Sequence, residues 1–138
     1  MNQKDTLKNL FSLEYDNSGY RSGLIDWYNM LIDKNIDELT VTDVAKMIRQ
    51  SILREVAVSR AVDLFLTDPY AGEMQDGELL ALLVSCIDDV MRLKEARSLL
   101  VVLSDLEDDI TPFDWDNDSN KTVFFQNLAI LKQSLEVL

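Results

Sequence analysis

Two groups of acidic residues have spacings that could bind a divalent cation. The first is Asp114-Trp115-Asp116-Asn117-Asp118, in which alternate carboxylates open like a calcium-binding loop. Its sixth position is Ser119 instead of the glycine that makes the sharp turn, and its twelfth is Phe125 instead of the bidentate glutamate. We therefore interpret the segment as a solvated acidic loop in which Asp118 caps the following helix.

The second group pairs Glu73-x-x-Asp76 with Asp105-x-x-Asp108, which on adjoining helices could hold Mg²⁺, as in all-helical nucleotide pyrophosphohydrolases. Here Glu73 falls in a loop ahead of the next predicted helix. A phosphate would also need basic side chains beside these pairs. The bases of this part of the chain do not lie next to either pair in the sequence; they are Arg92, Lys94 and Arg97. A magnesium-dependent nucleotide hydrolase is kept only as an alternative function.

The chain has no histidine, which excludes the Ser-His-Asp and Cys-His nucleophilic sites and most transition-metal sites. It has four glycines and no glycine-rich phosphate loop. The single cysteine, Cys86, lies among apolar residues without a neighbouring base to lower its pKa, which indicates a buried side chain and not a reactive thiol. We predict a protein that is not an enzyme and needs no metal or cofactor.

Two aromatic residues lie inside acidic loops. Tyr70 sits between Pro69 and Glu73, and Trp115 sits between two aspartates. A large ring surrounded by carboxylates suits a protein interface, where the ring anchors the partner and the charges steer it. Each ring could equally fill a gap in the core.

The elements that carry these residues are all predicted to be helices. Thr40-Val41-Thr42-Asp43 matches a capping box at a helix start, Asp68 before Pro69 is pushed out of helical geometry, and Asp76 is placed to cap the next helix. Apolar residues at helical spacing predict segments near residues 7–11, 24–32, 41–48, 58–67, 79–90, 93–106 and 118–138.

Only 99–103, a short apolar run, could be a buried strand, and its helical flanks favour a helix. The sequence thus predicts an all-α fold over a single domain, residues 1–138, built as a compact bundle or short solenoid-like array of about six or seven helices.

The acidic charge is concentrated in one part of the chain. The formal net charge is −12, and residues 63–118 alone carry fifteen acidic and three basic side chains. Such a one-sided field repels nucleic acid and anionic membrane and attracts a basic surface. We therefore expect a basic protein partner, with no direct binding to nucleic acid or membrane, although solubility alone could also explain the charge.

The N-terminal residues mix charge and polarity without an apolar run, which does not match a secretory signal. The longest apolar stretch, 79–87, is less than half the ~20 residues that span a bilayer. We expect a cytoplasmic protein.

Two motifs resemble those of immunity proteins from contact-dependent growth inhibition (CDI) systems. The first is Asp37-Glu38-Leu39-Thr40-Val41-Thr42-Asp43 with Met47-Ile48-Arg49-Gln50, and the second is Asp68-Pro69-Tyr70-Ala71-Gly72-Glu73 with Asp76-Gly77-Glu78-Leu79-Leu80. With their flanking helices they cover about residues 24–85. Asp68 stands where the family usually has Asn, Gln75 stands near a common aromatic position, and Glu73 and Glu78 take places associated with Asp.

The resemblance implies a protein that binds and neutralises a cognate toxin, as a heterodimer, and such toxins are frequently nucleases with basic clefts. On this view the acidic side chains pair with the toxin's Lys and Arg. The residues expected to bind are Tyr70, Glu73, Asp76 and Glu78 in one loop and Glu107, Asp108, Asp109, Asp114, Trp115 and Asp116 in the other. A helical adaptor or regulatory module is the main alternative.

Overall fold

The computed structural model describes residues 5–19, 22–73, 75–108, 113–115 and 117–137. Over these residues there is no strand, only an isolated bridge between Thr6 and Asn35. The elements are α1 (Leu7–Leu10), α2 (Gly23–Leu31), a 3₁₀ turn η1 (Ile36–Glu38), α3 (Val41–Gln50), α4 (Arg54–Thr67), α5 (Glu78–Ser85), α6 (Ile87–Met91), α7 (Ala96–Asp108) and α8 (Asp118–Glu136).

The predicted all-α class is confirmed, and six of the eight α-helices found in the described residues have seven or more residues. The run 99–103 is helical, within α7.

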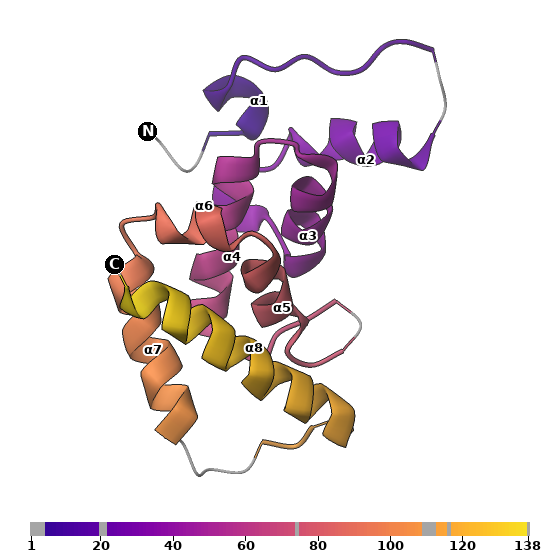
Figure 1. Ribbon diagram of the computed structural model, residues 1–138. Coiled ribbons are helices and arrows are strands. Elements are labelled where there is room, and N and C mark those ends of the chain that lie inside the picture. Colours follow the sequence, from indigo (N-terminus) through magenta and orange to yellow (C-terminus); the bar gives the residue numbers. More distant parts are fainter. Residues whose placement is uncertain (1–4, 20–21, 74, 109–112, 116, 138) are drawn as a thin grey trace.

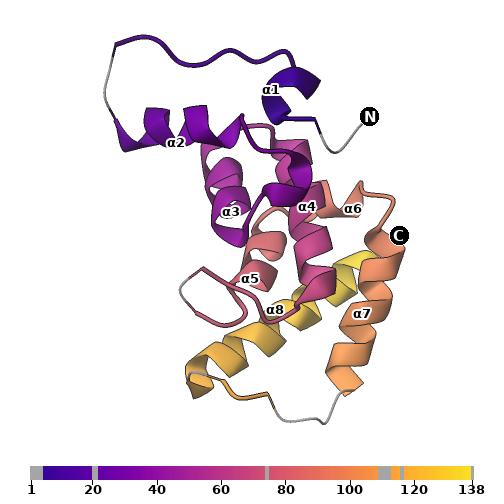
Figure 2. The same ribbon diagram turned by 180° about the vertical axis from the view of Figure 1, so that it is seen from behind.

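The helices form two groups joined through α4 and α5. In Figure 1, α1, α2 and α3 lie at one end of the molecule, and α7 and α8 lie at the other. The view from behind in Figure 2 shows the same order. The closest packing is between α3 and α4 at one end and of α8 against α5 and α7 at the other. The buried side chains of all these helices join in one hydrophobic cluster, whose largest members are Phe65 and Phe124.

The capping box at the start of α3 is present as predicted. The Thr40 hydroxyl accepts a hydrogen bond from the Asp43 backbone N–H (3.2 Å), and the Asp43 carboxylate accepts one from the Thr40 N–H (3.1 Å). The same carboxylate also accepts bonds from Lys34 Nζ (2.7 Å) and Trp27 Nε1 (3.3 Å). Asp43 is therefore a buried acid that ties α2 and the segment after it to the start of α3.

The proline stop is also confirmed. Helix α4 ends at Thr67, and Asp68 is extended, with φ −143° and ψ 94°. The steric effect of Pro69 on the preceding residue accounts for this conformation. The chain leaves the core here and enters the loop that leads to α5.

Two predicted caps are wrong. The residue before α5 is Gly77, at φ +83°, and no side chain caps that helix. Main-chain carbonyls, and not the Asp76 side chain, accept hydrogen bonds from backbone amides at the start of this helix. Gly77 N–H donates to Tyr70 O (2.7 Å), and Leu79 N–H donates to Ala71 O (2.9 Å). At α8 the cap is Asn117 and not Asp118, one residue earlier than expected, because its side chain accepts from the Asn120 N–H (2.8 Å).

One helix prediction also needs correction. Residues 79–90 are not one helix, because Cys86 leaves helical geometry (φ −122°, ψ 40°) and the bend lets α5 and α6 each pack against α4 and α8. The apolar face of α2 is buried only at its C-terminal end, where Leu31 and the following Ile32 enter the core. Leu24, in the first turn, is 40% exposed because α2 lies at the edge of the molecule (Figure 1).

Helices long and apolar enough to cross a bilayer are absent from the described part of the chain.

Candidate functional site

The first of the two motifs is held by hydrogen bonds to its main chain. Arg60, on α4, donates from Nε to Leu39 O (3.1 Å) and from Nη2 to Asp37 O (2.8 Å). One guanidinium thus fixes the 3₁₀ turn that leads into α3, since its planar fork can reach two carbonyls at once. The motif therefore has a structural role in placing α3 against α4.

The second motif forms a loop whose shape depends on close backbone contacts. The Asp68 carboxylate accepts a bond from the Tyr70 N–H (3.1 Å), which starts the turn. Gly72 lies so near the following chain that a Cβ built on it would be 1.9 Å from Gln75 O. Only glycine fits there without a shift of the backbone. The Glu78 carboxylate in turn accepts a hydrogen bond from the Gln75 N–H.

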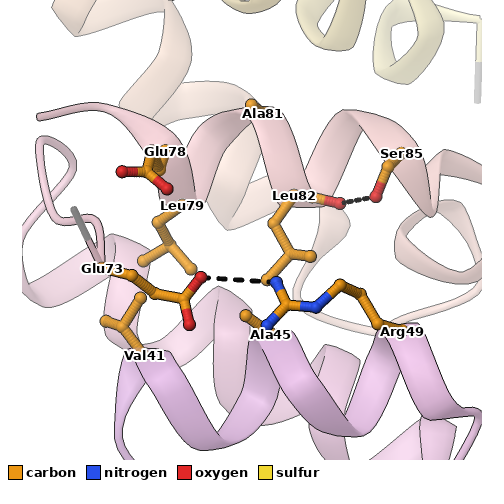
Figure 3. A pocket seen from close by; sticks show the side chains of 9 residues that line it. All are labelled: Val41, Ala45, Arg49, Glu73, Glu78, Leu79, Ala81, Leu82 and Ser85. Atoms are coloured by element: carbon orange, nitrogen blue, oxygen red, sulfur yellow. Dashed lines mark hydrogen bonds and ion pairs between the residues drawn. The ribbon is translucent and has the colours of Figure 1, made fainter. Parts of the chain in front are cut away.

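The two motifs meet across a pocket between α3 and α5. Val41, Ala45 and Arg49 follow one another at four-residue intervals along α3 and form one wall, as Figure 3 shows. Leu79 and Leu82 of α5 form the opposite wall. The loop contributes Glu73, whose carboxylate accepts a bond from Arg49 Nη1 (3.3 Å). The pocket has a volume of about 320 Å³.

A cluster of four aromatic rings joins the two acidic loops. The Tyr70 ring stacks on Phe113 with centroids 4.1 Å apart and meets Trp115 edge to face at 5.5 Å. Phe124, on α8, contacts both rings, with its centroid 5.2 Å from that of Tyr70 and 5.1 Å from that of Trp115. Both predicted anchors are half-buried and pack against the core, so much of each ring is used within the molecule.

The sequence reasoning missed Phe113 as a member of this cluster. Its position two residues before Trp115 was the available signal, because alternate residues of an extended segment point to the same side. Phe124 lies in the core, 1% exposed.

The structure places the predicted carboxylates in three kinds of environment. Glu73 and Glu78 line the pocket between α3 and α5. Asp76, which lies between them in the sequence, is half-buried. Glu107, on α7, accepts a bond from Lys132 of α8 (2.9 Å), which raises the pKa of that lysine. Asp108 and Asp114 are exposed, and the remaining two predicted residues, Asp109 and Asp116, lie outside the described residues.

Within the described ranges, no three acidic or cysteine side chains come together in a group that could hold a metal ion. The Glu73 side chain of the proposed magnesium group is instead paired with Arg49. Asp118 of the calcium-like segment opens α8, directly after the Asn117 cap.

Cys86 is buried, as predicted, with 3% of its surface exposed. Burial raises the pKa of the thiol to about 11, and the nearby Arg54 offsets this only in part. At neutral pH the group is a protonated thiol whose Sγ donates weakly to Leu82 O (3.3 Å).

Comparison with known proteins gives one family. A family model described as CDI immunity proteins matches residues 12–100, which include both motifs, the pocket between α3 and α5, and Tyr70. It ends before the second acidic loop and α8. A search of the curated proteins found no match.

Proposed function

The chain belongs to the family of CDI immunity proteins, and we propose from this membership that it binds one cognate toxin and neutralises it without catalysing a reaction. The two motifs that gave the resemblance lie within the matched residues, 12–100. The partner is a toxin domain, and the active unit is a heterodimer with it.

The charge distribution supports a toxin with a basic surface, and a nuclease is the class we propose. Nuclease clefts present Lys and Arg to phosphates, and carboxylates can take the places of those phosphates in charge-assisted hydrogen bonds. Fifteen acidic and three basic side chains fall in residues 63–118. This segment carries both loops of the aromatic cluster.

The contact between the loops is the observation that carries this proposal. Because Tyr70 stacks on Phe113, the loop after α4 and the loop before α8 are held together although they are more than 40 residues apart. Their carboxylates can then act as one acidic face, which we define as Glu73, Asp76, Glu78, Glu107, Asp108 and Asp114; Asp109 and Asp116 belong to it by sequence.

The rings have two roles in this proposal. They fix the distance between the loops, and the half-buried rings of Tyr70 and Trp115 anchor the toxin with the part of their surface that is not packed against the core. An exposed acid alone contributes little to affinity, whereas several carboxylates held in one arrangement give orientation and a faster encounter.

The test is charge reversal of each loop in turn. One variant carries Asp76→Lys with Glu78→Lys, and the other carries Asp108→Lys with Asp114→Lys. The matched control is Asp26→Lys with Glu55→Lys, which makes the same charge change on α2 and α4.

The toxin is first identified by affinity capture from the native cell at low and high salt, and its affinity for each variant is then measured at both. We expect each loop variant to bind more weakly, to lose much of the salt dependence, and to fail to protect cells that express the toxin. If affinity and salt dependence are unchanged in both loop variants, the acidic-face mechanism is wrong. A captured partner that the chain does not inhibit would instead support the adaptor alternative.

A further inference from the structure

The pocket between α3 and α5 already holds a basic side chain of the chain itself. In Figure 3 Arg49 extends along the pocket from α3, and its guanidinium points to Glu73. The Arg49 side chain is 55% exposed, whereas that of Glu73 is 19% exposed. The carboxylate is thus the more buried member of the pair, and the arginine is the more exposed one.

The lining of the pocket fits a long basic side chain. Its walls are apolar, formed by residues such as Val41, Ala45 and Leu82, and could cover the methylene groups of an Arg or Lys stem. Two carboxylates, Glu73 and Glu78, lie toward one end of it (Figure 3). Its volume of about 320 Å³ is at the low end of the ~300–1,000 Å³ typical of small-molecule pockets, so it suits a single side chain.

We propose that this pocket receives one Arg or Lys side chain of the toxin, which displaces Arg49 from Glu73. The proposal rests on the proposed function for the identity of the partner. Arg49 then acts as an internal substitute for the incoming cation, and it keeps the Glu73 carboxylate paired until the toxin binds. The charge complementarity is local, since the side chains that line the pocket include two carboxylates, Glu73 and Glu78, and one guanidinium, that of Arg49.

This arrangement predicts opposite effects for the two members of one ion pair. Glu73→Gln removes the acceptor that the incoming cation needs, so we expect affinity for the captured toxin domain to fall about 10- to 30-fold. Arg49→Gln removes the competitor, and since an exposed ion pair is worth ~0.2–1 kcal/mol, affinity should rise by up to about fivefold.

Two control variants separate the pocket from the overall field. Arg97→Gln removes the same charge at the start of α7, and Asp88→Asn removes one carboxylate from α6; both helices lie at the left of Figure 1, away from α3. The inference is overturned if Arg49→Gln binds no tighter than Arg97→Gln, or if Glu73→Gln binds as well as Asp88→Asn. Thermal unfolding of every variant checks that it is folded.

A second measurement does not need the toxin. Argininamide is titrated into the isotope-labelled chain, with glutaminamide as the neutral control, and the backbone amide signals of Ala45, Leu82 and Ser85 are followed. We expect shifts with argininamide that grow in Arg49→Gln and vanish in Glu73→Gln. Absence of these shifts overturns the pocket inference even if the toxin binds, whereas failure to find any inhibited toxin overturns the proposed function and leaves the titration to be judged separately.

Discussion

Removing the Asp43 carboxylate should destabilise the protein more than removing any exposed acid. Asp43 is 5% exposed, and its two oxygens accept hydrogen bonds from Lys34 Nζ, the Thr40 N–H and Trp27 Nε1. No buried side-chain polar atom in the described residues is without a partner, so this network is fully satisfied. Asp43→Ala leaves all three donors without their acceptor.

The size of the effect follows from the hydrogen bonds that the substitution removes. A helix N-terminal cap is worth ~1 kcal/mol, and a hydrogen bond to a charged group ~1.5–3 kcal/mol. We expect Asp43→Ala to lower the free energy of unfolding by ~2–4 kcal/mol at pH 7, and Asp43→Asn, which keeps one acceptor oxygen, by ~1–2 kcal/mol. The control Asp26→Asn, at an exposed position of α2, should change it by less than ~0.5 kcal/mol.

The pH dependence gives a second test of the same carboxylate. Burial alone would raise the pKa of Asp43, but the bonds from Lys34, the Thr40 N–H and Trp27 outweigh it, so the pKa lies below its usual value of 3.8. A lowered pKa stabilises the fold above the unfolded-state pKa, and this contribution is lost as the pH falls through the folded-state pKa.

Urea unfolding of the wild type and of Asp43→Asn should therefore differ by a constant amount between about pH 5 and 7 and converge below about pH 4. A cost for Asp43→Ala below ~0.5 kcal/mol, or a wild-type advantage that does not shrink in acid, would refute the reasoning.

Three further outcomes follow from the fold. Gly77→Ala should lower the thermal midpoint, since φ +83° costs another residue ~1–2 kcal/mol and its Cβ would lie 3.0 Å from the Phe124 ring. Tyr70→Leu keeps an apolar side chain but removes the stacking on Phe113, so we expect a cost of ~1 kcal/mol in urea unfolding and faster amide exchange in residues 113–115. Cys86, with its pKa raised to about 11, should resist iodoacetamide at pH 8 in the native protein and react at once in 6 M guanidinium; rapid native labelling would show that the thiol is accessible.

The features that the sequence determined by itself are those decided within a few residues of the chain. The Thr40–Asp43 capping box and the end of α4 before Pro69 depend on interactions between near neighbours, so residue type and spacing were enough to predict them. The helical periods, the acidic segment 63–118 and the two family motifs could be read in the same way. The caps at Asp76 and Asp118 failed because each depended on backbone angles that composition does not specify.

Only the tertiary structure decided which distant groups meet. The Arg49–Glu73 pair spans 24 residues, and the stacked rings of Tyr70 and Phe113 lie still farther apart in the chain. No local period encodes such pairings, because they depend on how α3, α5 and α8 pack together around the core. The same packing gives Asp43 its hydrogen bonds from Trp27 and Lys34. The sequence predicts Asp43 as part of a helix cap, but it does not predict that this carboxylate is buried and connects α2 to α3.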